Sequence, residues 1–137
     1  MRTAHSTTAA QRLLGLLAVG LLSLPIAAFA ADDLSGATLF ANHCAACHGP
    51  RGEGDGPVAA VMQIAVPNLR TLTQRSHGTF PTDAVMGYID GRKIPASHGD
   101  RQMPIWGDVF SAESSGGEKD VQARIAAIVA FIKQLQY

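Results

Sequence analysis

The stretch Cys44-Ala45-Ala46-Cys47-His48 decides the fold expected for this chain. Two cysteines are separated by two residues, and a histidine follows the second cysteine directly. At this spacing two thiols can add to the two vinyl groups of one porphyrin, because the short helical turn between them spans the distance. The histidine then lies under the ring, where its imidazole reaches the iron. The motif therefore predicts a covalently attached c-type haem on Cys44 and Cys47, with His48 as an axial ligand.

Three other chemistries use cysteines at a similar spacing. A thioredoxin-like redox pair expects a strand before the motif, whereas residues 34–43 have a helical pattern and no run rich in Val or Ile. A zinc site needs about four ligands, and crowding His43, Cys44, Cys47 and His48 into one short stretch would be unusual geometry. A disulfide between the two cysteines would close a very tight loop. The sequence favours haem attachment over these alternatives.

Length and charge narrow the class of protein. The chain has 137 residues, which suits one domain with a modest core. Its 11 basic and 11 acidic residues balance, and this argues against nucleic acid as a partner. Both cysteines lie in one motif, so there is no disulfide framework to infer. We find no internal repeat and no sign of a second domain.

The first thirty residues have the features of a signal peptide. Arg2 and Arg12 flank a polar segment, and residues 13–31 carry no charge. The stretch Ala28-Phe29-Ala30 has small residues at the two positions that a signal peptidase requires for cleavage. An uncleaved membrane anchor is the alternative, because the uncharged run just reaches spanning length. We expect a signal peptide over 1–30, export to the periplasm, no membrane span after cleavage, and one domain over 31–137.

Apolar periodicity predicts one helix near each end of this domain. The first covers 34–47, and its Gly36 and Phe40 share a face because they are four residues apart. The second covers 120–136, where apolar residues recur at steps of three and four. A glycine at position 36 would let the second helix approach closely. We expect Phe131 of that helix to pack against this contact.

The middle of the chain predicts one more helix. Pro81 and Asp83 suit its first turn, and Gly91 suits its end after Asp90. Its Val85, Met86 and Ile89 form one apolar face. The remaining segments are expected to be loops over 49–57, 69–80 and 91–107, with short helical turns within 58–66 and 108–112.

A carbonyl group near Pro67 is expected to orient His48. Proline holds the residue before it in an extended conformation, so the chain bends at Pro67-Asn68-Leu69. A carbonyl at this bend can accept the Nδ1–H of the imidazole, which fixes the ring and raises its basicity. A plain turn is the alternative.

The loop over 91–107 carries the candidate for the second axial ligand. Met103, Ile105 and Trp106 are apolar residues in a polar loop, and the face of a haem would give them a surface to pack against. Met103 is the expected sixth ligand, because its neutral, soft thioether favours the ferrous state. Pro104 would stiffen the ligand loop.

Other residues compete with Met103 for the sixth position. His98 would give ligation by two histidines, although a solvated loop histidine is its simpler interpretation. Met86 belongs to the apolar face of a predicted helix and fits the core. Met62 follows the glycine-rich loop and is a candidate for the pocket wall. His43 and His77 are less well placed.

The order of these features resembles the class I c-type cytochromes. The likeness covers residues 34–137 and rests on Gly36 and Phe40, Cys44 to His48, Pro67-Asn68-Leu69, Met103-Pro104 and Phe131. It implies an all-α fold, in which a small bundle of three to five helices surrounds one covalently bound haem c. The stretch 103–107 is similar to that of bacterial periplasmic members, several of which serve as haem subunits of dehydrogenases or oxidases.

Two features depart from the family pattern. A polar insertion around 111–118 has no assigned role, and Val66 precedes Pro67 where many members have Gly.

The resemblance implies a periplasmic one-electron carrier of a respiratory chain, and not an enzyme. With His48 and Met103 on the iron, no axial position is open to a substrate. A donor dehydrogenase and an acceptor oxidase or reductase are the expected partners. One alternative is a cytochrome subunit of a larger dehydrogenase or oxidase complex, and another is a haem protein whose open sixth position binds small gases or peroxide.

Three basic residues near Met103 suggest where a partner could dock. Arg92, Lys93 and Arg101 would form a weakly basic rim for an acidic partner, tuning the encounter rate. Ordinary solvated loop charges, or partners of the haem propionates, are the alternative.

Overall fold

The computed structural model describes residues 34–93 and 101–137. Within these ranges the chain is helical and contains no strand. Four helices have eight residues or more: α1 (Gly36–His43), α4 (Thr82–Asp90), α5 (Trp106–Glu113) and α6 (Gly117–Gln134). The shorter elements are α2 (Ala45–His48), α3 (Leu72–Arg75) and the 3₁₀ turns η1 (Ala59–Val61) and η2 (Leu69–Thr71). The predicted all-α fold is confirmed.

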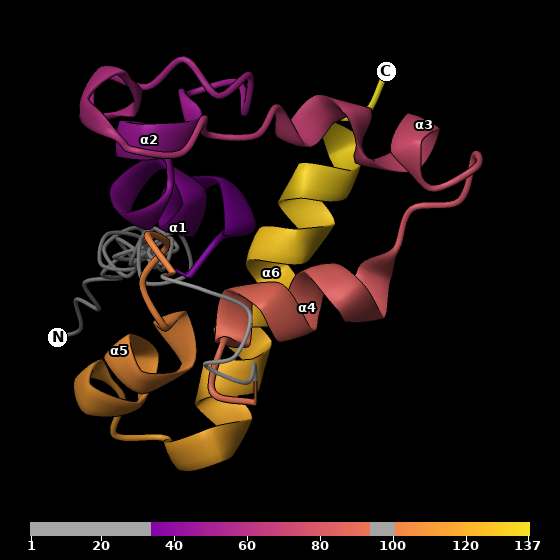
Figure 1. Cartoon of the computed structure of the whole chain (residues 1–137). Helices are drawn as coiled ribbons and strands as arrows, with labels where there is room; N and C mark the ends of the chain where they lie inside the picture. Colours follow the sequence, from indigo (N-terminus) through magenta and orange to yellow (C-terminus); the bar gives the residue numbers. More distant parts are fainter. Residues whose placement is uncertain (1–33, 94–100) are drawn as a thin grey trace, which may run out of the picture.

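Helix α6 is the element on which the other long helices pack. Helices α1, α4 and α5 all lie against it (Figure 1). Its buried side chains recur at steps of three and four, as the sequence predicts, and they form the largest part of the core: Val121, Ile125, Ile128, Val129 and Ile132. The single long helix therefore organises the bundle through one apolar face.

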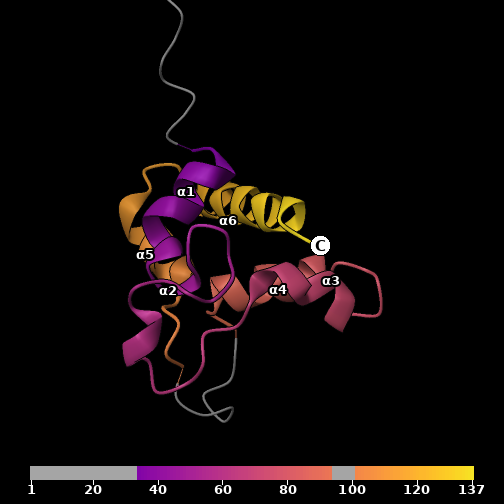
Figure 2. The same ribbon diagram turned by 90° about the horizontal axis from the view of Figure 1, so that it is seen from above.

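Helix α1 crosses α6 at Gly36, and Figure 2 shows the two helices side by side. A Cβ atom at position 36 would overlap the backbone carbonyl of Ala127, so only glycine allows this approach. Phe40 is 1% exposed, and its ring centroid lies 5.2 Å from that of Phe131. The predicted contact of Gly36, Phe40 and Phe131 is confirmed.

The predicted helix over 34–47 is divided at Cys44. This residue ends α1 and precedes α2, and its φ of −117° departs from helical values. Its amide still donates to the Phe40 carbonyl at 2.9 Å. The prediction of one continuous helix is wrong at this point, because the backbone at Cys44 departs from regular helical geometry before the turn that carries His48.

Helix α4 has the bounds that the sequence predicts, and it ends at Gly91 in the left-handed conformation with φ of 73°. The prediction of loop over 69–80 is wrong in its first half, since η2 and α3 occupy 69–75. Two hydrogen bonds with Gln136, which is far from this segment in sequence, stabilise these turns. The amide of Thr73 donates to the Gln136 side chain at 2.9 Å, and Gln136 donates to the Leu69 carbonyl at 2.8 Å.

The polar insertion around 111–118 forms the end of α5, a three-residue connection and the start of α6. The hydroxyl of Ser114 donates to Asp120 at 2.5 Å and accepts from the amide of Gly116 at 3.0 Å. Both helices are longer here than predicted, and these bonds order the connection between them.

Three sequence-based predictions fall outside the described residues. These are the signal peptide over 1–30, the domain start at 31 and the position of His98. In the two described ranges, no helix combines the length and the apolar character needed to cross a membrane.

Candidate haem-binding site

Helix α2 places Cys44, Cys47 and His48 on one tight turn. The amides of Cys47 and His48 both donate to the Cys44 carbonyl, at 3.2 and 2.9 Å. Both thiols are free, and no disulfide joins them. Burial, with a smaller contribution from Cys47, raises the pKa of Cys44 to about 12. Cys44 is therefore a protonated thiol at neutral pH, unlike the thiolate on which a redox-active pair depends.

The zinc alternative finds no support in the described residues. Nowhere in 34–93 or 101–137 do three or more side chains of His, Cys, Asp or Glu converge as metal ligands. His43 instead packs against α5, where its ring lies 5.2 Å from the ring of Trp106 and 5.2 Å from that of Phe110.

The glycine-rich loop folds back onto α2 and satisfies its free carbonyl groups. Gly54, Gly56 and Val58 donate from their amides to the carbonyls of His48, Cys47 and Ala46, at 2.8, 3.1 and 2.9 Å. A Cβ atom at Gly56 would lie 2.6 Å from the Ala45 carbonyl oxygen. A four-residue helix cannot satisfy its own carbonyls, so the loop is what holds this turn in place.

The imidazole of His48 is buried and oriented by Pro67. Its Nδ1 donates to the Pro67 carbonyl over 3.3 Å, as the sequence predicts. Because a carbonyl only accepts, Nδ1 carries the proton and Nε2 keeps its lone pair in the neutral ring. Burial lowers the pKa of His48, and the bond to Pro67 opposes this shift only in part. His48 is thus a neutral imidazole with one nitrogen available to a metal.

The segment 62–67 joins the His48 turn to the segment that carries Met103. At one end the Pro67 carbonyl meets His48, and nearby the amide of Ile64 donates to the Gln102 side chain at 3.1 Å. Met103 is partly buried and packs against the core. The structure therefore connects the regions of both expected ligands through one short stretch. Ligation by Met103 stays a prediction.

The competing residues lie in different surroundings. Met86 packs against the core from α4, as expected, and Met62 is partly buried directly after η1. His77 is exposed in a turn, with a φ of 54°. His98 is outside the described residues.

Two of the three basic residues near Met103 have partners within the chain. Arg92 pairs with Asp90 at 2.7 Å and with Glu118 at 2.7 Å. Arg101 donates to backbone carbonyls, including that of Met103 at 2.8 Å. These contacts leave less charge available to a docking partner than the sequence suggested. The basic rim stays a prediction.

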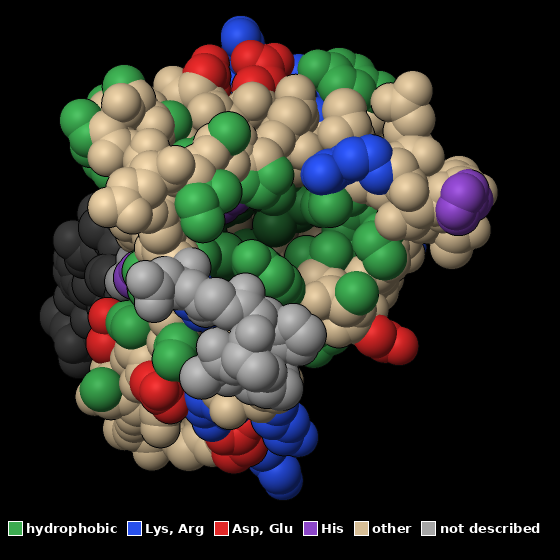
Figure 3. All heavy atoms as spheres, in the orientation of Figure 1, with side chains coloured by type: hydrophobic (Ala, Val, Ile, Leu, Met, Phe, Trp, Pro, Cys, Tyr) green, Lys and Arg blue, Asp and Glu red, His purple; other side chains and the backbone are tan. Residues whose placement is uncertain are grey.

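One face of the molecule is hollowed where these elements meet. Figure 3 shows a recess lined with hydrophobic side chains in the region of α6, between α2 and α4. The elements around it contribute partly buried apolar side chains that pack against the core: Ala45, Leu69, Leu72, Val85, Met86 and Met103. An apolar recess between α4 and α2, the helix that contains His48, suits a flat, hydrophobic group.

Comparison with known families decides the identity of the fold and its cofactor. The family model described as Cytochrome c matches residues 34–136, which is almost all of the described chain. The chain belongs to the cytochrome c family. Searches of the curated proteins and of the solved structures found no match. Cytochromes c carry covalently attached haem c, so haem c is the cofactor and electron transfer is the function of this chain.

The described residues of this cytochrome c fit that cofactor. Cys44 and Cys47 supply free thiols, and His48 supplies an oriented nitrogen. Two features of the site were missed by sequence reasoning. Nothing in the order of residues indicates that Gly56 must meet the backbone of α2, or that Arg101 bonds to carbonyls on two separate segments. Both depend on how distant parts of the chain come together.

Proposed function

We propose that this cytochrome c is a periplasmic one-electron carrier with a single haem. Cys44 and Cys47 attach the haem, and His48 and Met103 are its axial ligands. The observation that carries the proposal is the hydrogen bond from His48 to Pro67, because it leaves Nε2 as the only ring nitrogen available to iron.

The two cysteines, His48 and the loop that folds onto their turn each have a defined task. The two cysteines fix the position of the group, and the bonds from Gly54, Gly56 and Val58 keep their turn from opening. The Pro67 carbonyl holds the imidazole plane and strengthens its donation. An electron carrier needs these groups to move little when the iron changes oxidation state, because structural rearrangement slows electron transfer.

Met103 and the apolar recess set the balance between the ferric and ferrous states of the haem. When bound, the haem supplies a one-electron couple between its ferric and ferrous states. A thioether ligand is neutral and soft, and the apolar side chains that pack against the core beside Met103 offer the haem surroundings of low polarity. Both features disfavour additional positive charge and therefore favour the reduced protein.

Export to the periplasm is supported by the sequence of residues 1–30, which combines basic residues, an uncharged run and a cleavage signal. Attachment of haem after export would fit a chain whose thiols must still be free when it crosses the membrane. The partners that we propose are redox proteins, a dehydrogenase as donor and an oxidase or reductase as acceptor.

Purification of the full chain after expression in a haem-attaching bacterium tests this proposal. We expect the periplasmic product to lack residues 1–30, to carry one covalent haem, and to follow a single one-electron redox titration curve. The reduced protein should not bind carbon monoxide, because Met103 occupies the sixth position.

Two results would direct the proposal elsewhere. Rapid binding of carbon monoxide would indicate an open sixth position and a role with small gases or peroxide. Elution at a fixed ratio with a dehydrogenase or oxidase would indicate a subunit of a larger enzyme instead of a free carrier. A product with alanine at Cys44 and Cys47 should bind no covalent haem, and it serves as the control.

A further inference from the structure

We propose that Arg101 is a positioning residue for Met103. Its guanidinium holds the Met103 segment against the C-terminal end of α4, and this keeps the thioether within reach of the haem iron. The role rests on the proposed ligation by Met103 and adds a residue that acts through it.

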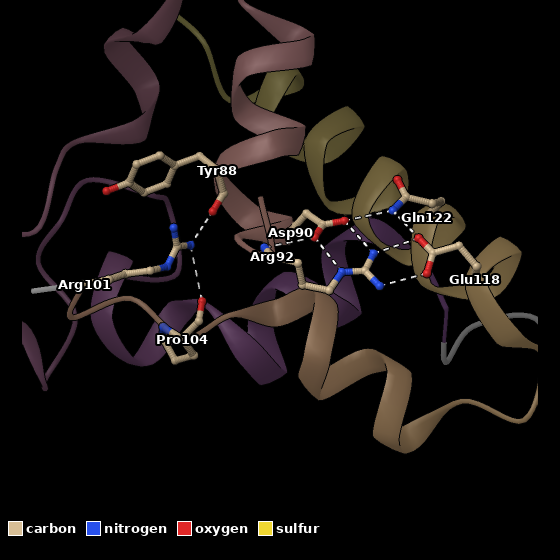
Figure 4. Close-up of polar contacts among 7 residues, drawn as sticks. All are labelled: Tyr88, Asp90, Arg92, Arg101, Pro104, Glu118 and Gln122. Atoms are coloured by element: carbon tan, nitrogen blue, oxygen red, sulfur yellow. Dashed lines mark hydrogen bonds and ion pairs between the residues drawn. The ribbon is translucent and has the colours of Figure 1, made fainter. Parts of the chain in front are cut away.

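The guanidinium of Arg101 bonds to the backbone of two segments, the end of α4 and the segment that contains Met103 (Figure 4). Its Nε donates to the Met103 carbonyl at 2.8 Å. Its Nη2 donates to the Tyr88 carbonyl in the last turn of α4, and more weakly to the Pro104 carbonyl at 3.4 Å. The side chain of Arg101 thus joins the end of α4 to the expected ligand, Met103, and to the residue that follows it, Pro104.

The end of α4 is shaped to receive this group. The guanidinium carbon lies 4.8 Å from the centroid of the Tyr88 ring, a distance at which a cation is attracted to the ring face. A Cβ atom at Gly91 would lie 3.0 Å from the same carbon. Gly91 therefore both ends α4 in the left-handed conformation and leaves space for Arg101.

The Met103 segment needs such contacts because no helix or strand orders residues 101–105. A segment without regular structure loses much conformational freedom when it presents a ligand at one point. Arg101 fixes the carbonyls of Met103 and Pro104, and the proline ring fixes its own φ. The side chain of Gln102 accepts a further bond from the amide of Ile64. With the backbone held, only the flexible side chain of Met103 remains to be placed.

Arg92 provides a matched control at the same helix end. Its hydrogen bonds go to Asp90 and Glu118, and they join α4 to α6 (Figure 4). Loss of Arg92 should therefore lower the stability of the fold while leaving the bonds to Met103 and Pro104 in place. Loss of Arg101 should affect the placement of Met103 as well.

Competition between imidazole and Met103 measures this placement in the oxidised holoprotein. Imidazole is added, and the loss of the weak sulfur-to-iron charge-transfer band is followed. We expect Arg101→Ala to bind imidazole about tenfold more tightly than the wild type, as loss of a hydrogen bond from a charged donor would produce. Arg92→Ala should bind imidazole as the wild type does, even if both variants melt at lower temperature.

Arg101→Lys separates geometry from charge. An ammonium group keeps the charge but lacks the planar fork that reaches two carbonyls at once. We expect an imidazole affinity between those of the wild type and Arg101→Ala. This variant also keeps the test usable if Arg101→Ala does not fold.

Two results would overturn the role of Arg101, and they differ. If the wild type shows the band and Met103→Ala lacks it, but Arg101→Ala and Arg101→Lys bind imidazole as Arg92→Ala does, Arg101 is structural only. If the wild type lacks the band, Met103 is not the ligand and the positioning role fails with it.

Discussion

Nδ1 of His48 donates to the carbonyl of Pro67 over 3.3 Å, and the residues next to Pro67 hold that carbonyl in place. The amide of Leu69 donates to the Gly52 carbonyl at 2.7 Å. The side chain of Asn68 accepts from the amide of Arg70 at 2.8 Å and caps η2. The orientation of the imidazole therefore depends on a turn that can be altered without touching His48.

Asn68→Ala should raise the reduction potential. Loss of the cap loosens the turn, the Pro67 carbonyl binds Nδ1–H less firmly, and a less basic imidazole stabilises the ferric state less. We expect a rise below about 60 mV, the shift for a tenfold change in a one-electron equilibrium, and a stability loss of about 1 kcal/mol. Redox titration measures the first quantity. A fall in potential would contradict the role of the turn.

Two glycine-to-alanine substitutions should change stability in opposite directions. At Gly36 a methyl group would overlap the Ala127 carbonyl, so Gly36→Ala should destabilise the protein by about 1–3 kcal/mol. At Gly87, in exposed α4 surface, a Cβ atom meets no described heavy atom within 4 Å. Gly87→Ala should therefore stabilise the helix by about 0.5–1 kcal/mol.

Denaturant unfolding of both variants measures these changes. If Gly36→Ala were neutral or stabilising, the backbones of α1 and α6 would not approach each other closely at Gly36.

Stability should fall in acid through the carboxylate of Asp90. Hydrogen bonds from the Arg92 guanidinium hold the pKa of this carboxyl well below its usual range, and Gln122 adds a further bond. Because the pKa of Asp90 is lower in the folded than in the unfolded protein, its carboxylate stabilises the fold fully above the unfolded pKa of about 4. This stabilisation is lost progressively as the pH falls below that value. The melting temperature should therefore decline as the pH is lowered through this range.

Asp90→Asn removes most of this pH dependence. At neutral pH the variant should be less stable by about 1 kcal/mol, since the group is partly exposed and its pairing is screened. That corresponds to roughly 4–8 °C in melting temperature for a domain of this size. Glu118→Gln, whose side chain is 60% exposed, should have a smaller effect. An unchanged acid slope in Asp90→Asn would show that other carboxylates are responsible.

Arg70 should stabilise the C-terminal end of α6 against the turn after Pro67. Its guanidinium donates to Glu53 at 2.8 Å and to the Leu135 carbonyl at 3.1 Å, and it lies 4.2 Å from the Tyr137 ring centroid. Arg70→Met should cost about 1–3 kcal/mol in unfolding free energy.

Arg51 is the control for Arg70, because it bonds to the same Glu53 but its side chain is 71% exposed. Arg51→Met should leave the midpoint of denaturant unfolding nearly unchanged. Equal losses in the two variants would mean that the contact with the end of α6 contributes nothing.

Local patterns predicted those parts of the fold that rest on periodicity or on one special residue. The apolar steps of α6, the bounds of α4 and the contact at Gly36 follow from residue types alone. The bond from His48 to Pro67 followed from the chemistry that a metal-binding imidazole requires.

Other parts depend on contacts between distant segments. The turns over 69–75 are mostly polar and too short to show an apolar period, and Gln136 stabilises them from the other end of the chain. The bond of Arg101 to the Tyr88 carbonyl has the same origin, since the two residues are 13 positions apart. No pattern within the local sequence marks such contacts, because their partners are brought together only by the bundle.

The optical spectrum of the oxidised protein tests the central claim most directly, with Met103→Ala beside the wild type and Met86→Ala as the control. Ligation by His48 and Met103 predicts a weak sulfur-to-iron charge-transfer band in the wild type and in Met86→Ala, and its loss in Met103→Ala. A covalent haem whose spectrum shows no such band in the wild type would contradict ligation by Met103. A protein without covalent haem would contradict the account at its first step.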